Sequence, residues 1–125
     1  MPVGNDYYPP FSEAEYKRRY RMIKDAMKEK GLDCLLVYGA YSYGGTDPGQ
    51  VNTVYLSSCP AALNCYVVFP LKDDPTLILC IALHVPNAKD ISVIKDVRSS
   101  PGREVEIGVG LRLKELGLEK GNIGI

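Results

Sequence analysis

The fold is decided at residues 27–38, Met-Lys-Glu-Lys-Gly-Leu-Asp-Cys-Leu-Leu-Val-Tyr, where an amphipathic pattern gives way to a continuous apolar run. Upstream of this stretch, apolar residues recur with a helical period of about 3.6 residues: Tyr16, Tyr20, Ile23 and Met27. Gly31 stands where a left-handed residue ends a helix, and Leu32 is the apolar residue that follows such a cap. The run Cys34–Tyr38 then predicts a strand that is buried on both faces.

The start of this helix is marked by a capping pattern. Ser12 and Glu15 have the spacing of a capping box, and Phe11 and Tyr16 stand where a hydrophobic staple requires apolar side chains. We therefore predict a helix over Ser12–Lys30, preceded by an irregular lead-in over residues 1–10. Its opposite face is expected to be solvated, with the charged residues Lys17, Arg18, Arg21, Lys24, Asp25 and Lys28.

The rest of the chain alternates strand and helix patterns. Strands are predicted over 53–57, 65–70 and 76–82, with a weaker one over 91–94 and another beginning at 122–125. A hairpin turn over 71–75 and a second helix over Pro101–Leu116 complete the series. This order predicts an α/β fold, a three-layer domain whose mixed β-sheet is flanked by helices and has Cys34–Tyr38 at its centre.

Composition excludes several classes of function. The length of 125 residues fits one domain, and 15 Lys+Arg balance 15 Asp+Glu. Without a basic excess, a nucleic-acid partner held by charge is not expected. The longest apolar runs fall far short of the roughly 20 residues that span a membrane. Because the first residues also lack a secretory signal pattern, we expect a cytoplasmic protein with no membrane contact.

The four cysteines are expected to be reduced, structural thiols. They form no Cys-x-x-Cys pair, and His84 is the single histidine, so a zinc site is not expected. Cys34, Cys65 and Cys80 lie in apolar runs and are predicted to be buried. Cys59, in a loop, is the one predicted to be exposed.

Catalytic motifs are missing from the sequence. It contains no Gly-x-Ser-x-Gly, no phosphate-binding loop and no Gly-x-Gly-x-x-Gly after a strand. Ser57 or Ser58 would need a base and an oxyanion hole to act as a nucleophile, and neither can be named. No carboxylate flanks His84, which is interpreted as a structural histidine at a strand end or in a loop. We expect no catalytic residue and no metal ligand in this chain.

Several short motifs nevertheless occur in a recognisable order. They are Glu15-Tyr16 with Arg18-Arg19, the stretch from Met27 to Val37, Asn52-x-x-Tyr55-Leu56-Ser57-Ser58, Pro75–Leu79, Leu113–Leu118 and Ile123-Gly124. Over roughly residues 11–125 the chain resembles the N-terminal domain of the creatinase, prolidase and aminopeptidase P family. In that family's pattern a glycine stands where this chain has Ser58.

The resemblance implies a domain that precedes a separate hydrolase domain. In the family, that catalytic domain has the pita-bread fold, binds two divalent metal ions (Mn, Co or Zn) through two Asp, one His and two Glu, and in the peptidases cleaves a bond next to proline. Since the chain ends as a strand begins, we expect the parent protein to continue beyond residue 125 and to be a metallopeptidase. The N-terminal domain would then serve oligomerisation, as a homodimer, and access of proline-containing peptides.

Two other functions remain open at this point. Related domains occur as binding modules in proteins that lost catalysis, histone chaperones among them, although a net charge of +0 does not favour a histone partner. Creatinase-like amidinohydrolases share the same N-terminal architecture. Metal ligands encoded after residue 125 would favour the hydrolases, and their absence would favour the binding module.

The loop over Gly39–Gln50 is the candidate substrate-access site. It leaves the C-terminal end of the strand Cys34–Tyr38, and ligand sites of α/β folds lie beyond such ends. Tyr41, Tyr43 and Asp47 are predicted to enclose substrate without breaking bonds, in resembling proteins commonly at the partner subunit's site. The alternative is a surface loop with no ligand role. The same loop and the lead-in also offer aromatic contacts for self-association, namely Tyr7, Tyr8, Tyr41 and Tyr43.

Overall fold

The computed structural model describes residues 11–40, 48–61 and 63–125, and in this part a mixed sheet runs in the order β4-β3-β2-β1-β5. Its strands are β1 (Cys34–Gly39), β2 (Cys65–Pro70), β3 (Thr76–Leu79), β4 (Asp96–Ser99) and β5 (Ile123–Gly124). The helices are α2 (Glu13–Lys30), α3 (Val51–Ser57), α4 (Val85–Ile91) and α5 (Val105–Glu115). The predicted lead-in, residues 1–10, lies outside the described residues.

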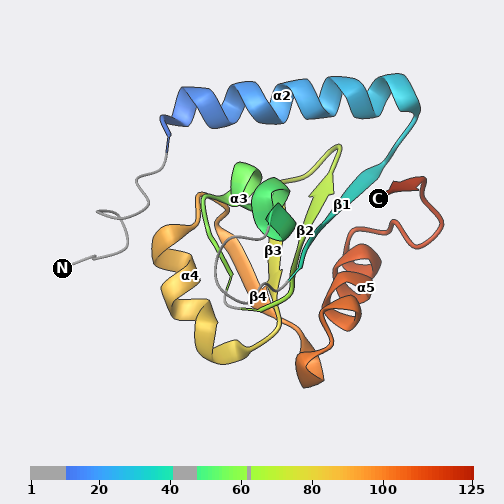
Figure 1. Cartoon of the computed structure of the whole chain (residues 1–125). Coiled ribbons are helices and arrows are strands. Elements are labelled where there is room, and N and C mark those ends of the chain that lie inside the picture. Colours follow the sequence, from blue (N-terminus) through green and yellow to red (C-terminus); the bar gives the residue numbers. More distant parts are fainter. Residues whose placement is uncertain (1–10, 41–47, 62) are drawn as a thin grey trace.

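The helices cover the two faces of the sheet unequally (Figure 1). Apolar side chains of α2, α3 and α4 pack on one face, and α5 packs on the other. Along β2 the side chains alternate between these layers, because Val67 and Phe69 belong to the first cluster and Val68 to the second. The predicted α/β class and its three layers are therefore confirmed.

The two ends of α2 confirm the caps. The Ser12 Oγ accepts a hydrogen bond from the Glu15 N–H at 3.2 Å. At the other end Gly31 has a left-handed φ of 68°, and its N–H donates to the Lys28 carbonyl while that of Leu32 donates to Met27. The Glu15 carboxylate accepts from Arg18 and Arg19, so it is not engaged as the capping box expected.

The hairpin is also where it was expected, but the centre of the sheet is not. β1 pairs antiparallel with β2, and β2 with β3. The prediction that Cys34–Tyr38 lies at the centre is wrong, because β2 is the middle strand. On its side away from β2, β1 has one neighbour in the sheet, the short strand β5, which pairs only with Cys34 and Leu35. Tyr38, at the far end of β1, is consequently exposed rather than buried on both faces.

The strand predicted over 53–57 is the helix α3, and contacts distant in sequence explain the difference. Its sequence, with Thr53, Val54 and Tyr55 in a row, suits a strand. In the structure, however, the carbonyls of Tyr55 and Leu56 accept hydrogen bonds from the Arg19 Nη1 and Tyr20 hydroxyl of α2, at 2.7 and 2.6 Å. These partners satisfy carbonyls that the end of a helix leaves open.

The second half of the chain departs from prediction in its boundaries. Ile91 closes α4 instead of opening a strand, and the strand there is β4, a few residues later. The second helix begins at Val105, because Gly102 and Arg103 have left-handed φ values of 64° and 68° that interrupt the turn after Pro101. The strand predicted over 76–82 ends at Leu79.

Ser58 generates the first testable prediction. It ends α3 with a left-handed φ of 62°, a conformation that costs a residue with a Cβ about 1 kcal/mol or more. We expect Ser58→Gly to raise the free energy of unfolding by about 1 kcal/mol, measured by urea denaturation. As the matched control, Gly31→Ala at φ 68° should lower it by about 1 kcal/mol, since an added Cβ there meets nothing within 4 Å. A loss of stability in Ser58→Gly would contradict the strain assigned to this position.

Candidate functional site

The directions of the strands place several strand ends, and the segments that connect them, at one edge of the sheet. β1 and β3 both run antiparallel to β2, and β3 is parallel to β4, so these three strands end at the same edge. The carboxyl ends Gly39, Leu79 and Ser99 lie there, together with the start of β2 at Cys65. Ligands of open α/β sheets bind beyond such ends.

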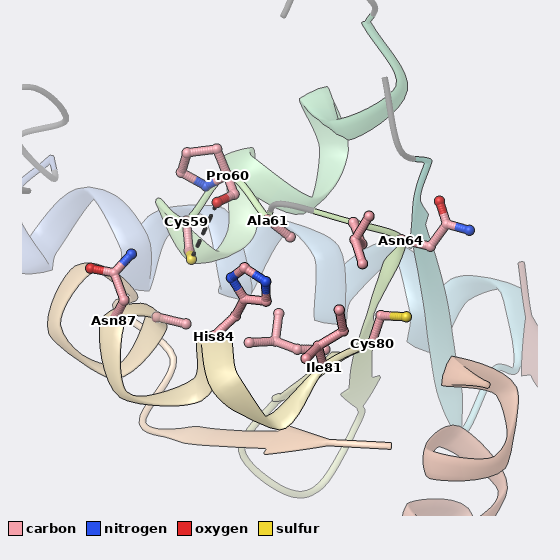
Figure 2. Close-up of a pocket in the computed structure, with 11 residues that line it drawn as sticks. Cys59, Pro60, Ala61, Asn64, Cys80, Ile81, His84 and Asn87 are labelled. Carbon is pink, nitrogen blue, oxygen red and sulfur yellow. Dashed lines mark hydrogen bonds between the residues drawn. The ribbon is translucent and has the colours of Figure 1, made fainter. Parts of the chain in front are cut away.

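A cavity of about 170 Å³ opens at this edge, between the segment after α3, the end of β3 and the start of α4. Figure 2 shows the His84 imidazole close to Cys59 and Ala61, with Asn87 at one end of the lining and Asn64 at the other. The lining is completed by Pro60, Leu63, Leu79, Cys80, Ile81 and Ala88. It therefore combines amides, thiols and one imidazole with apolar side chains.

Gln50 holds the wall that follows α3. Its Nε2 donates to the Leu63 carbonyl at 3.2 Å, and its Oε1 accepts from the Ala61 N–H at 3.0 Å. One side chain thus ties the segment between α3 and β2 to the beginning of α3. At the end of the helix, the Ser57 Oγ donates to the Thr53 carbonyl at 2.7 Å and accepts from the Cys59 N–H at 3.1 Å. The wall is thereby held at both ends of α3.

Burial decides the chemistry of the cavity. Cys59 is only 3% exposed, and desolvation raises the pKa of its thiol to about 11, so it is protonated near neutral pH. Its Sγ donates to the Pro60 carbonyl at 3.8 Å. Within the described part of the chain, no group of three or more His, Cys, Asp or Glu side chains could hold a metal ion. The Cys59 thiol in the cavity wall is therefore not an activated nucleophile.

The predictions for individual residues fare differently. Cys59 is buried, contrary to expectation, because the segment after α3 turns inward. Cys80, predicted to be buried, is the partly exposed thiol, because β3 ends at Leu79 before it. His84 lies in the short 3₁₀ turn Ala82–His84, consistent with its interpretation as a loop residue. Asn64 and Asn87 had not been singled out, since the sequence signal around them is that of ordinary loop and helix positions.

The predicted substrate-access residues, Tyr41, Tyr43 and Asp47, lie outside the described residues. The segments on either side of them are described. The Ala40 N–H donates to the Gly49 carbonyl at 3.1 Å, so the loop leaves and returns at the carboxyl edge. Gly39, the last residue of β1, packs so closely that an added Cβ would lie 2.6 Å from the Cys65 Sγ.

Thiol accessibility provides a second prediction. In the native protein at about pH 8, iodoacetamide should label Cys80 at least about tenfold faster than Cys34, Cys59 or Cys65, because burial raises the pKa of each of those three thiols to about 11. Mass spectrometry of digested protein would report each site, and the urea-unfolded protein, in which all four thiols should react, is the control. Fast native labelling of Cys59 would show that the cavity wall is open.

Comparisons with known proteins agree with the fold. No family model matches the sequence, and no curated protein matches it. Among solved structures, the Xaa-Pro dipeptidase of Bacillus anthracis matches 82% of this chain with a TM-score of 0.61 at 18% identity. Dipeptidase PepE of Mycobacterium ulcerans matches 82% with a TM-score of 0.58 at 22% identity.

The chain spans only about a quarter of these structures, 25% of the first and 27% of the second. None of the helices in the described residues is long and apolar enough to cross a membrane. The resemblance drawn from the sequence motifs is thus confirmed at the level of the fold: the chain has the architecture of one part of two larger dipeptidases.

Proposed function

We propose that this chain is the non-catalytic N-terminal domain of a metal-dependent hydrolase of the Xaa-Pro aminopeptidase or dipeptidase type. The observation that carries the proposal is the likeness of 82% of the chain to a quarter of an Xaa-Pro dipeptidase, with a TM-score of 0.61. In such a protein, residues 11–125 form the first domain and the bond-breaking groups lie in a second.

The proposal assigns the metal chemistry to that second domain. The described residues of this chain do not fit two divalent ions, because they contain no suitable group of His, Cys, Asp or Glu. The Mn, Co or Zn ions expected for the family would be bound by residues of the second domain. This chain would contribute the carboxyl edge of the sheet, with a cavity whose lining contains no Asp, Glu, Lys or Arg.

Substrate access is assigned to the carboxyl edge. We propose that Tyr41, Tyr43 and Asp47 help to enclose a proline-containing peptide, at the partner's site of a cytoplasmic homodimer. Support comes from the Ala40–Gly49 hydrogen bond, which returns the loop to the edge where ligands of α/β sheets bind. Tyrosine rings bury large areas at little entropic cost, which suits such an enclosure.

The coding sequence downstream of the codon for Ile125 tests the assignment most simply. We expect an open frame that encodes two Asp, one His and two Glu in a second domain, and a longer protein that hydrolyses Xaa-Pro dipeptides when loaded with Mn²⁺. Residues 1–125 alone should show no turnover under the same conditions. A downstream domain without these ligands would refute the proposal and favour a binding module.

The access role has its own test in the longer protein. We expect Tyr43→Ala and Asp47→Ala to lower kcat/KM by about tenfold, mainly through KM, with metal content unchanged. The matched control is Val51→Ala, an exposed residue of α3 outside the loop. Unaltered kinetics in both loop variants would show that the loop does not contact substrate.

A further inference from the structure

Four backbone groups in the cavity wall after α3 are already hydrogen-bonded. The Cys59 N–H donates to a hydroxyl of α3 at 3.1 Å, and the Pro60 carbonyl accepts from the Cys59 thiol. Gln50 binds the Ala61 N–H and the Leu63 carbonyl. The wall is therefore shaped before a ligand enters, as is usual for ligand sites, and it presents mainly its apolar side chains to the cavity.

The opposite wall carries two polar side chains with hydrogen-bonding capacity. Within the residues that the structure describes, the His84 imidazole and the Asn87 carboxamide make no hydrogen bond and no ion pair. Figure 2 shows the imidazole extending across the cavity toward Cys59 and Ala61. A carboxamide both donates and accepts, and an imidazole nitrogen does one or the other. A peptide group, with one N–H and one C=O, supplies matching partners.

The lining offers no carboxylate, ammonium or guanidinium group to a ligand, since none of its described residues is Asp, Glu, Lys or Arg. The Cys59 thiol is protonated near neutral pH, because burial raises its pKa to about 11. A charged group that left water for this cavity would lose its hydration without gaining a counter-charge. The lining therefore favours an uncharged ligand over a free amino acid or the charged end of a peptide.

Apolar side chains set the size of the ligand. Pro60, Leu63, Leu79, Ile81 and Ala88 line the cavity, and two of them, Leu79 and Ala88, are only 3% and 4% exposed. The volume of about 170 Å³ is close to the ~150 Å³ of an apolar cavity engineered in another protein, which binds benzene. It is smaller than the roughly 300 Å³ at which sites for drug-sized molecules begin. The cavity thus fits one apolar side chain of a larger molecule.

The cavity adjoins the start of the access loop. Asn64, at one end of the lining, directly precedes Cys65, which pairs with Gly39 across β1 and β2. The residue after Gly39 is Ala40, which is hydrogen-bonded where the loop returns. On the other side of β2, Cys65 pairs with Leu79, which lines the cavity as well. A peptide enclosed at the carboxyl edge would lie within reach of the cavity.

We propose that this cavity binds one uncharged apolar side chain of a peptide, with a flanking peptide group hydrogen-bonded to His84 and Asn87. The residue bound is an internal one, because the cavity offers no counter-charge to either end of a peptide. This inference rests on the proposed function only for the peptide as the source of the side chain. Since both residues of a dipeptide are terminal, the site favours the aminopeptidase type over the dipeptidase type.

The test is an NMR titration of residues 1–125 with N-acetylleucine amide, which reproduces an uncharged internal residue. The backbone amide shifts of Asn64, Cys80 and Asn87 should change together and saturate in the millimolar range. N-acetylglycine amide lacks the apolar side chain and free leucine carries both terminal charges, so each should bind at least about tenfold more weakly. Equal binding of the glycine probe, equal binding of leucine, or no saturable shift would each overturn the inference.

Two variants with matched controls locate the binding. Ala61→Leu fills the cavity and should weaken binding of N-acetylleucine amide at least about tenfold, whereas Ala26→Leu, at an exposed position of α2, should leave it unchanged. Asn87→Ala should weaken it about fivefold, and Asn52→Ala, at an exposed asparagine outside the cavity, should not. Because Asn87 is exposed, its variant decides the matter even if Ala61→Leu fails to fold. Unchanged binding in Asn87→Ala would overturn the inference.

The cavity site and the proposed function fail separately. The titration needs neither a metal ion nor a second domain, so a lack of probe binding would refute the cavity site alone. A downstream domain without metal ligands would refute the proposed function, and saturable binding of N-acetylleucine amide would then identify the chain as a peptide-binding module.

Discussion

Two side chains of α2 hold the last carbonyls of α3, and the carboxyl edge of the sheet depends on this contact. Arg19 donates to the Tyr55 carbonyl and Tyr20 to the Leu56 carbonyl, while the Val93 N–H donates to Ser57 at 2.8 Å. Three successive carbonyls at the end of one helix thus have partners far away in sequence. Because these contacts fix the end of α3, they also fix the position of Ser58 and of the cavity wall that comes after it.

The Arg19 guanidinium can be buried at this contact because aromatic rings and a carboxylate stabilise its positive charge. Its guanidinium carbon lies 4.1 Å from the centre of the Tyr55 ring and 4.6 Å from that of Phe11, and its Nε donates to the Glu15 carboxylate at 3.0 Å. Hydrogen bonds from Arg18 and Arg19 lower the pKa of Glu15 to about 2, which keeps that carboxylate charged. A buried charge without such partners would destabilise the fold.

Local signals were sufficient where the chain specifies its own structure. The helix from Ser12, its end at Gly31, the strand that starts at Cys34 and the hairpin after Pro70 all follow from caps, periodicity and turn residues close in sequence. The position of Ala40 at the carboxyl edge was predictable for the same reason, since it follows a well-marked strand.

The signals failed where tertiary contacts decide. A segment containing Thr53, Val54 and Tyr55 has strand propensity. The partners of its last carbonyls, among them Arg19 and Tyr20, are distant in sequence, so no local pattern reveals the helix. Cys59 was predicted to be exposed because it lies in a loop, whereas its burial depends on where α3 ends. The cavity walls, assembled from residues 59–61, 63–64, 79–81, 84 and 87–88, could not be predicted without the sheet order.

Hydrogen exchange of α3 in Tyr20→Phe tests most directly whether α2 holds this helix in place. The substitution keeps the ring against Phe69, 5.1 Å between centroids, and removes only the hydroxyl that bonds Leu56. Tyr16→Phe, on the same helix and with no hydroxyl hydrogen bond to the described residues, is the control. The Ser58 amide, which donates to the Val54 carbonyl at 2.8 Å, should exchange about tenfold faster in Tyr20→Phe than in the control, while β2 amides keep their rates. Identical exchange of α3 in both variants would contradict the role assigned to Tyr20.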